Sequence, residues 1–149
     1  MKVYRIANRI EIDNFLENKS FMRIGSTFNE ICRNNSHHYK RNTFYMHFFD
    51  SKADTFYFNS PLKRFLCTYD IPDEVTQGHL GIGKYISKYD SSKEVYVLEY
   101  AIPSKFIKLE YLESIEVLPV NYTFKEFLQS GEYNSQIVYS KENTNLLKR

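Results

Sequence analysis

The spacing of hydrophobic and polar residues predicts a strand, two helices and a buried strand in the first third of the chain. Residues 2–6 alternate between two faces, as in a strand, and the apolar positions within 12–16 are spaced as on a helix. Thr27 and Glu30 form a capping box that predicts a second helix. Large side chains on both faces of residues 43–49 predict a strand in the middle of a sheet.

The middle of the chain continues with a short helix, two strands and a loop between them. The apolar positions of residues 53–57 are spaced as on a helix, which Pro61 ends. Residues 65–71 alternate in polarity and predict a half-buried strand. The glycines of the Gly78–Gly83 segment predict a loop that forms a lid or a turn. Residues 94–102 predict a long strand.

The remaining elements complete an α+β order. We expect a helical turn at 72–74, a short helix and a last strand within 106–118, and a helix that starts at the capping box 123–126. Because no regular βαβ repeat is present, the order predicts a single compact α+β domain with mixed or antiparallel sheets and short helices. We place this domain at residues 1–139 and expect residues 140–149 to be a frayed tail.

Composition and charge narrow the class of protein. The 149 residues are 42% hydrophobic, which suffices for one core. The formal net charge of +2 argues against a dedicated nucleic-acid binder. Cys32 and Cys67 lie in apolar stretches without metal-ligand spacing, which predicts a reducing, cytoplasmic location and no metal. No stretch has the length of a membrane span, so we expect no membrane partner.

Aromatic residues are the unusual feature of the composition. The chain has 13 Tyr and 12 Phe but no Trp. Large rings fill a core, stack on flat ligands and are enriched at protein interfaces. The composition therefore leaves open a packed core, a ligand site and a Tyr-rich binding surface.

Glu99 is the first candidate for a functional residue. It shares a strand face with Val95, Val97 and Ala101, and a carboxylate on an apolar face is costly unless it is paired. Such positions are candidates for function. The alternative is that Glu99 lies at an exposed strand end or pairs with a Lys or Arg.

Arg5 and His47 are the next candidates. Arg5 in the first strand suits a bidentate clamp for phosphate or carboxylate if it faces a cleft, and is otherwise a structural arginine. His47 shares a face of the predicted central strand with Tyr45 and Phe49. A lone histidine there is either hydrogen-bonded core or a site residue.

Arg33, Lys40 and Arg41 form the basic patch of the sequence, together with His37 and His38. The patch could contact nucleic acid, but we favour a solvated loop. His37 and His38 are a poor metal site because adjacent side chains diverge.

Several segments together resemble the ADP-ribosyltransferase superfamily. Val3-Tyr4-Arg5 is similar to the first strand of many small bacterial members. Residues 45–49, followed by Ala53 and Phe56-Tyr57, resemble the strand and helix that hold nicotinamide in that family. The strand 94–102 resembles the one that presents the catalytic glutamate, although Glu94 and Glu99 stand five apart in place of a Glu-x-Glu pair.

The resemblance implies a split-sheet architecture, NAD as the substrate, and roles for the candidate residues. Arg5 and Glu99 would be the catalytic pair, with Arg5 on the NAD pyrophosphate and Glu99 on the ribose. Tyr45 or Tyr57 would stack on nicotinamide, beside His47 on the strand edge. No metal is implied.

Two functions follow from these observations. The first is an NAD-dependent ADP-ribosyltransferase-like toxin or effector that modifies a host macromolecule and is encoded by a phage or another mobile element. The alternative is a non-catalytic binding protein, such as a phage inhibitor of host defence, an antitoxin or an immunity factor, that acts through a Tyr-rich surface. Both predict a protein partner or target.

Overall fold

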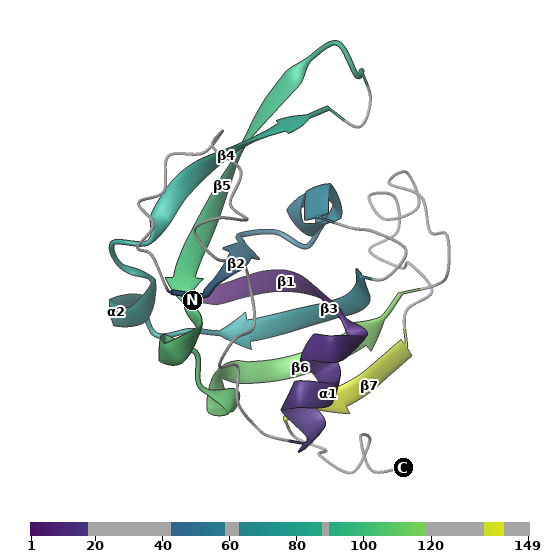
Figure 1. The fold of residues 1–149 in the computed structure, drawn as a ribbon, viewed down its shortest axis with the longest axis vertical. Helices are drawn as coiled ribbons and strands as arrows, with labels where there is room; N and C mark the ends of the chain where they lie inside the picture. The colour runs from purple at the N-terminus through teal and green to yellow at the C-terminus, as the bar shows by residue number, and fades with distance from the viewer. Residues whose placement is uncertain (18–42, 59–62, 88–89, 119–135, 142–149) are drawn as a thin grey trace.

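The computed structural model describes residues 1–17, 43–58, 63–87, 90–118 and 136–141 (Figure 1). Seven strands make up most of this part: β1 (Lys2–Asn8), β2 (Tyr45–Phe49), β3 (Lys63–Asp70), β4 (Leu80–Ile86), β5 (Glu94–Pro103), β6 (Leu112–Val117) and β7 (Gln136–Ser140). The helices are short: α1 (Arg9–Glu17), α2 (Asp73–Thr76) and the 3-10 turns η1 (Ala53–Phe58), η2 (Ser104–Phe106) and η3 (Leu109–Tyr111).

The seven strands form one antiparallel sheet in the order β4-β5-β2-β1-β3-β6-β7. The predicted α+β class is therefore confirmed, with an antiparallel rather than a mixed sheet. β1 pairs with β3 along its whole length, but it meets β2 at the single register pair Tyr4↔Phe49. Two groups of strands, β4-β5-β2 and β1-β3-β6-β7, are thus joined by one narrow contact.

Among the described residues, both faces of the sheet pack against short helical elements. On one face, which we call the α1 face, Val3, Phe48 and Ile102 form a buried cluster with Ile12 of α1. On the other, which we call the η1 face, Ile6, Leu66 and Leu118 pack with Phe56 of η1. Because residues alternate along each strand, register pairs assign side chains to one of these two faces wherever the register is regular.

The strands predicted at residues 2–6, 43–49 and 94–102 are confirmed as β1, β2 and β5. The expected half-buried strand is wrong in one respect: neighbouring residues Leu66 and Cys67 of β3 are both buried, because β3 lies inside the sheet between β1 and β6. The predicted helices after Thr27 and at 123–126 lie outside the described residues.

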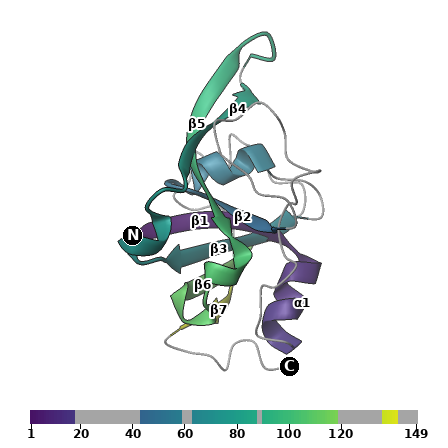
Figure 2. The ribbon, with the colours of Figure 1, turned by 60° about the vertical axis from the view of Figure 1, so that its left-hand side comes forward.

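The expected glycine loop is also wrong, because Gly81 and Gly83 lie within β4. Gly78 alone of the described glycines has a positive φ, 82°, and it sits in the turn before the strand. β4 pairs with β5 from Leu80↔Tyr100 to Ile86↔Glu94. Figures 1 and 2 show this two-stranded ribbon projecting away from the rest of the sheet.

The last described strand, β7, was not expected. It pairs with β6 from Ser114↔Ser140 to Val117↔Gln136, in a segment that the pattern assigned partly to the tail. The sheet therefore ends in β7, and β6 is an internal strand rather than the last one.

Candidate functional site

Glu99 lies in the middle of β5 and has an exposed fraction of 1%. Its register partners are Phe49 of β2 and Gly81 of β4. Because Phe49 also pairs with Tyr4, which packs in the η1-face cluster, the Glu99 side chain belongs to the η1 face. The expectation of a carboxylate on an apolar strand face is confirmed, and an exposed strand end is excluded.

Tyr85 holds the Glu99 carboxylate from the neighbouring strand β4. Its hydroxyl donates a hydrogen bond to Glu99 Oε2 at 2.6 Å, the length expected when an O–H donates to a carboxylate. Gly83 makes room for this arrangement. A β-carbon at residue 83 would lie 2.6 Å from Glu99 Oε1 and 2.6 Å from Tyr85 Cε2.

Two further rings surround the phenol that holds Glu99. Tyr57 of η1 stacks on Tyr85, with ring centres 5.3 Å apart and an interplanar angle of 29°. Phe49 contacts the same Tyr85 ring at 6.5 Å. The structure therefore brings Tyr57, a residue 42 positions away in sequence, into the aromatic cluster beside Glu99.

His47 and Tyr45 occupy the same face of β2 at increasing distance from Glu99. His47 pairs with Ala101, which puts it diagonally across from Glu99, at roughly 7–8 Å. Tyr45 pairs with Pro103, four residues along β5 and so roughly 13 Å from Glu99. Both side chains are buried. The geometry groups His47 with the Glu99 cluster and leaves Tyr45 at the far end of the strand.

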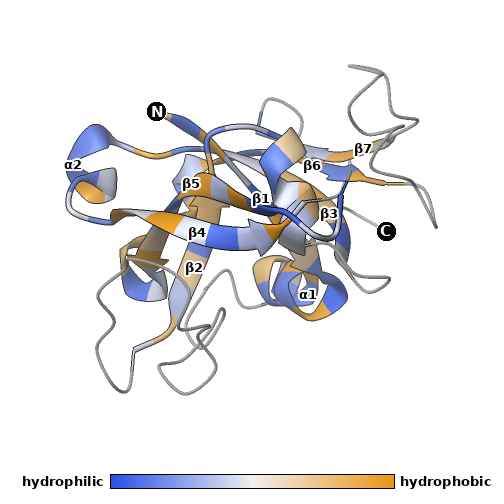
Figure 3. Cartoon of the chain, turned by 90° about the horizontal axis from the view of Figure 1, so that it is seen from above, coloured by the Kyte–Doolittle hydropathy of each residue, from blue (hydrophilic) through white to orange (hydrophobic). Residues whose placement is uncertain are grey.

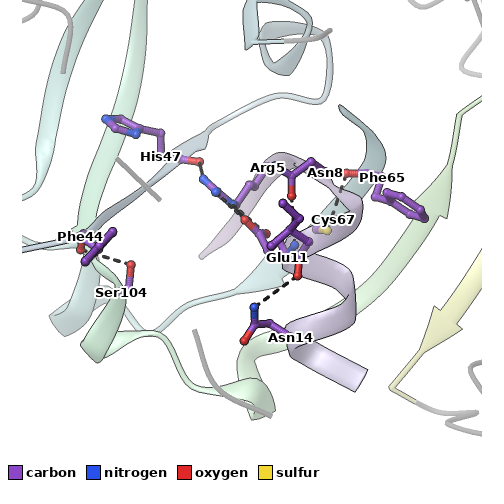
Figure 4. Close-up of polar contacts among 10 residues, drawn as sticks. Arg5, Asn8, Glu11, Asn14, Phe44, His47, Phe65, Cys67 and Ser104 are labelled. Carbon is purple, nitrogen blue, oxygen red and sulfur yellow. Dashed lines mark hydrogen bonds and ion pairs between the residues drawn. The ribbon is translucent and has the colours of Figure 1, made fainter. Parts of the chain in front are cut away.

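Arg5 points to the opposite face of the sheet. It pairs with Cys67 in the register and forms an ion pair with Glu11 of α1, with Nη2 2.6 Å from Oε1 (Figure 4). Arg5 Nε donates to both Glu11 oxygens at 3.0 Å, and Nη1 donates to the backbone carbonyl of His47 at 3.2 Å. The guanidinium therefore links β1, β2 and α1 on the α1 face.

The single hollow expected to hold both Arg5 and Glu99 is not formed. Tyr4, not Arg5, shares the face of Glu99, because neighbouring strand residues point to opposite sides. Burial by itself lowers the pKa of Arg5, but the charge and hydrogen bonds of Glu11 outweigh this and raise it. Asn8 Oδ1 accepts a hydrogen bond from the Glu11 backbone N–H and so fixes the start of α1. Arg5 is a structural arginine.

Sequence reasoning missed Tyr85 and Gly83, because both were placed in or beside a loop. A period of two is visible in Leu80-Gly81-Ile82-Gly83, with large residues on one face and glycine on the other. Such a pattern is typical of a strand whose glycine face is approached closely by another group. That group is the Glu99 carboxylate.

The remaining candidates give no second site. Cys67 is a free, buried cysteine, and burial raises the pKa of its thiol well above the ordinary value, which leaves it unreactive. Within the described ranges, no group of three or more His, Cys, Asp or Glu side chains is placed to hold a metal ion. Arg33, Lys40 and Arg41 lie outside the described residues.

Comparison with known proteins gives no assignment: no family model, no curated protein and no solved structure matches the chain. In the part of the chain that the structure covers, no helix combines the length and the apolar character needed to cross a membrane.

Proposed function

We propose that the chain is an NAD-dependent ADP-ribosyltransferase-like enzyme in which Glu99 is the catalytic carboxylate. The observation that carries the proposal is the placement of this buried side chain, which is held by Tyr85, on whose ring Tyr57 stacks. A carboxylate fixed in a site from which water is largely excluded interacts strongly with positive charge that develops beside it. NAD cleavage develops such charge on the ribose.

The sheet supports this proposal at the level of architecture. Its two groups of strands share the single register pair Tyr4↔Phe49, and a narrow junction of this kind supports the proposed split-sheet architecture. Glu99 stands in the same row of residues, one strand further along. The candidate site thus lies beside the narrow junction between the two groups of strands.

The proposed reaction uses Glu99 to stabilise the ribose as nicotinamide leaves. The bond between ribose C1′ and nicotinamide N1 breaks, and its electron pair neutralises the positive charge of the nicotinamide ring. The positive charge that forms on the ribose is stabilised by the Glu99 carboxylate, which also accepts a ribose hydroxyl proton in a hydrogen bond. An oxygen of water or of the target then attacks C1′ and loses its proton.

Tyr57 and Tyr85 provide the surface for the nicotinamide ring. Their ring centres are only 5.3 Å apart, so a third ring does not fit between them. Nicotinamide would instead stack on the outer side of the pair, with the gain expected for an offset aromatic contact.

Lys52 takes the place of Arg5 as the proposed phosphate contact. Its Nζ lies 5.9 Å from the centre of the Tyr4 ring, in the row that leads through Phe49 to Glu99. The same ammonium forms an ion pair with Glu116 at 3.2 Å, with the lysine side chain partly exposed. A pyrophosphate that displaces Glu116 would gain a cation on the correct face of the sheet.

The test is nicotinamide release from NAD by the purified chain, measured by chromatography. We expect Glu99→Gln, which keeps the shape of the side chain, to lower the rate by roughly 100- to 1,000-fold, the usual loss of one charge-stabilising group. Lys52→Ala should mainly raise KM for NAD. The matched control is Glu94→Gln, because Glu94 lies on the same strand but on the other face, paired with Lys84 at 3.1 Å.

Two results would contradict the catalytic proposal. One is the absence of both nicotinamide release and any rise in melting temperature at millimolar NAD. The other is an equal loss of activity in Glu94→Gln and Glu99→Gln. Either result leaves the non-catalytic binding protein as the better function, which the exposed apolar side chains of the β4–β5 ribbon favour.

A further inference from the structure

Thr68 of β3 carries a buried hydroxyl that has no hydrogen-bond partner in the fold. Among the described residues, the buried Ser and Thr side chains are Thr55, Thr68, Thr76 and Ser104. The hydroxyls of Thr55, Thr76 and Ser104 each donate to a backbone carbonyl. Thr68 is 7% exposed, and its side chain makes no hydrogen bond with any described residue. Its hydroxyl is therefore the member of this set that stays available to a ligand.

A buried hydroxyl without a partner destabilises the fold. The group loses its hydrogen bonds to water and gains none from the protein. Valine has the same branched shape, is favoured in strands and carries no polar atom that needs a partner. A threonine at this position therefore indicates a use for the hydroxyl outside the fold.

Two more hydroxyls flank Thr68 in the same row of the sheet. Register pairs join Tyr4 of β1 to Thr68, and Thr68 to Ser114 of β6, so the three side chains share the η1 face. Tyr4 and Ser114 are half-buried, and neither hydroxyl bonds to a described residue. We call Tyr4, Thr68 and Ser114 the hydroxyl row. Figure 3 shows hydrophilic positions in blue among the hydrophobic ones on their strands.

A cation and a carboxylate lie beside the hydroxyl row. Lys52 Nζ is 5.9 Å from the centre of the Tyr4 ring and 3.2 Å from Glu116 Oε2. Tyr4 and Glu116 belong to β1 and β6, the two neighbours of β3, so the ammonium lies near the Thr68 face of that strand. Glu116 stands two residues from Ser114 and therefore on the same face. Hydroxyls, an ammonium and a carboxylate are thus within reach of one ligand.

The hydroxyl row is in line with Glu99. Glu99 pairs with Phe49, and Phe49 pairs with Tyr4, which begins the hydroxyl row. Thr68 is three strands from Glu99 in the sheet, or roughly 14 Å at the usual strand spacing. A ligand that contacts both residues must be elongated and carry polar groups along its length.

We propose that the hydroxyl row binds the ADP half of NAD. This inference rests on the proposed function, in which the nicotinamide ribose lies beside Glu99 and the pyrophosphate contacts Lys52. The Thr68 hydroxyl then donates to a phosphate oxygen next to the Lys52 ammonium. The second ribose follows the phosphates along the row. Its hydroxyls donate to Glu116, which the phosphates release from Lys52, and Ser114 bonds to the same ribose.

The Glu116 carboxylate sets the class of dinucleotide. A carboxylate accepts hydrogen bonds from ribose hydroxyls, but it repels a phosphate at the 2′ position. The site therefore favours NAD over NADP. Nicotinamide mononucleotide has no adenosine to place on the row, so it should be a poorer substrate than NAD.

The experiment measures ADP binding to the purified chain by calorimetry, together with thermal unfolding in the absence of ligand. Thr68→Val should weaken ADP binding roughly 10- to 100-fold, the effect of one lost hydrogen bond to a charged group. Its melting temperature should stay the same or rise, because no hydrogen bond within the protein is lost. The matched control is Thr76→Val, which removes a 3.0 Å bond to the Asp73 carbonyl. It should lower the melting temperature and leave ADP binding unchanged.

Three results would overturn the inference. The first is no binding of ADP at millimolar concentration. The second is a Thr68→Val variant that binds ADP as tightly as the unaltered chain. The third is a loss of melting temperature in Thr68→Val equal to that in Thr76→Val, which would make the hydroxyl structural.

Nicotinamide release separates this inference from the proposed function. We expect a higher kcat/KM for NAD than for NADP or nicotinamide mononucleotide, and Glu116→Gln should narrow the preference for NAD over NADP. Equal kcat/KM for NAD and the mononucleotide would overturn the ADP site and leave the proposed function standing. ADP binding that depends on Thr68, without any nicotinamide release, would support the ADP site and contradict the proposed function.

Discussion

Glu11 and Glu99 are both almost sealed from solvent, at 4% and 1% exposed, but they lie on opposite faces of the sheet with different partners. Glu11 is neutralised by the guanidinium of Arg5 through three contacts of 2.6–3.0 Å. Glu99 accepts a hydrogen bond from the Tyr85 phenol, which orients the carboxylate without adding an opposite charge.

The two buried carboxylates therefore differ in their hydrogen-bond donors, a guanidinium for Glu11 and a phenol for Glu99. The Glu11 carboxylate forms a bidentate ion pair with Arg5, which connects α1 to β1. Arg5 also donates a hydrogen bond to the His47 carbonyl of β2. The Tyr85 phenol that donates to Glu99 is a neutral group within a cluster of rings. We infer that the Arg5–Glu11 pair stabilises the fold, and the variants below compare it with Glu99, the residue of the proposed function.

Removing one member of each pair is the strongest way to test this comparison. Glu11→Gln leaves the Arg5 guanidinium buried without its counter-charge, and we expect it to lower the free energy of unfolding by about 3–5 kcal/mol. Glu99→Gln keeps a neutral acceptor for the Tyr85 hydroxyl and should cost about 1–3 kcal/mol, less than Glu11→Gln. Urea denaturation at pH 7 measures both.

A double replacement sharpens the result for Arg5 and Glu11. Arg5→Met with Glu11→Leu removes both charges and should recover most of the stability lost in Glu11→Gln, because no charge is left buried alone. Equal losses in the two single glutamine variants, or no recovery in the double variant, would contradict the structural role of the pair.

Gly83→Ala tests the cradle of Glu99 without touching its charge. The new β-carbon would lie 2.6 Å from Glu99 Oε1 and 2.8 Å from its Cδ, so the carboxylate and the Tyr85 ring must move. Overpacking of this kind costs about 1–3 kcal/mol. We expect nicotinamide release to fall with it, which the assay for Glu99→Gln measures.

Gly78→Ala is the control for this substitution. Gly78 has no atom within 4 Å of a β-carbon position, but its φ of 82° strains any other residue. The cost should be about 1 kcal/mol, with no change in NAD turnover. If Gly83→Ala also left nicotinamide release unchanged, the close approach of Glu99 to β4 would play no role in the proposed activity.

Asp54 of η1 is a third kind of carboxylate, half-buried, and its replacement should have the smallest effect on stability. Burial raises the pKa of this half-buried side chain, the hydrogen bond with Ser51 lowers it, and neighbouring Asp50 raises it. Its ionised form is therefore less favourable in the fold than in the unfolded chain, a cost that is present at neutral pH and vanishes below the ordinary value of 3.8.

Asp54→Asn should therefore raise the melting temperature slightly at pH 7, and the gain should shrink as the pH falls towards 3.8, where Asp54 takes up its proton in both states. Thermal unfolding of both proteins across this pH range measures the difference. A gain that stays constant with pH would mean that the substitution acts through packing rather than through charge.

The sequence by itself predicted the class of fold and the apolar strand face on which Glu99 lies. Alternation along residues 94–102 places Glu99 with Val97 and Ala101, and the spacing of 53–57 predicts a helical element that carries Tyr57. These are local properties, because the period of a strand or helix fixes which side chains share a face.

The partners of the charged residues could not be read from the sequence. Alternation shows that Arg5 shares a face with Val3, but not that α1 folds back to bring Glu11 onto it. Likewise, Gly81 and Gly83 predicted a loop, because the sequence does not show that β4 pairs with β5. In the structure, Glu99 of β5 fills the space over Gly83. The period of a strand fixes the face on which a residue lies, whereas long-range strand pairing decides which residues cover that face.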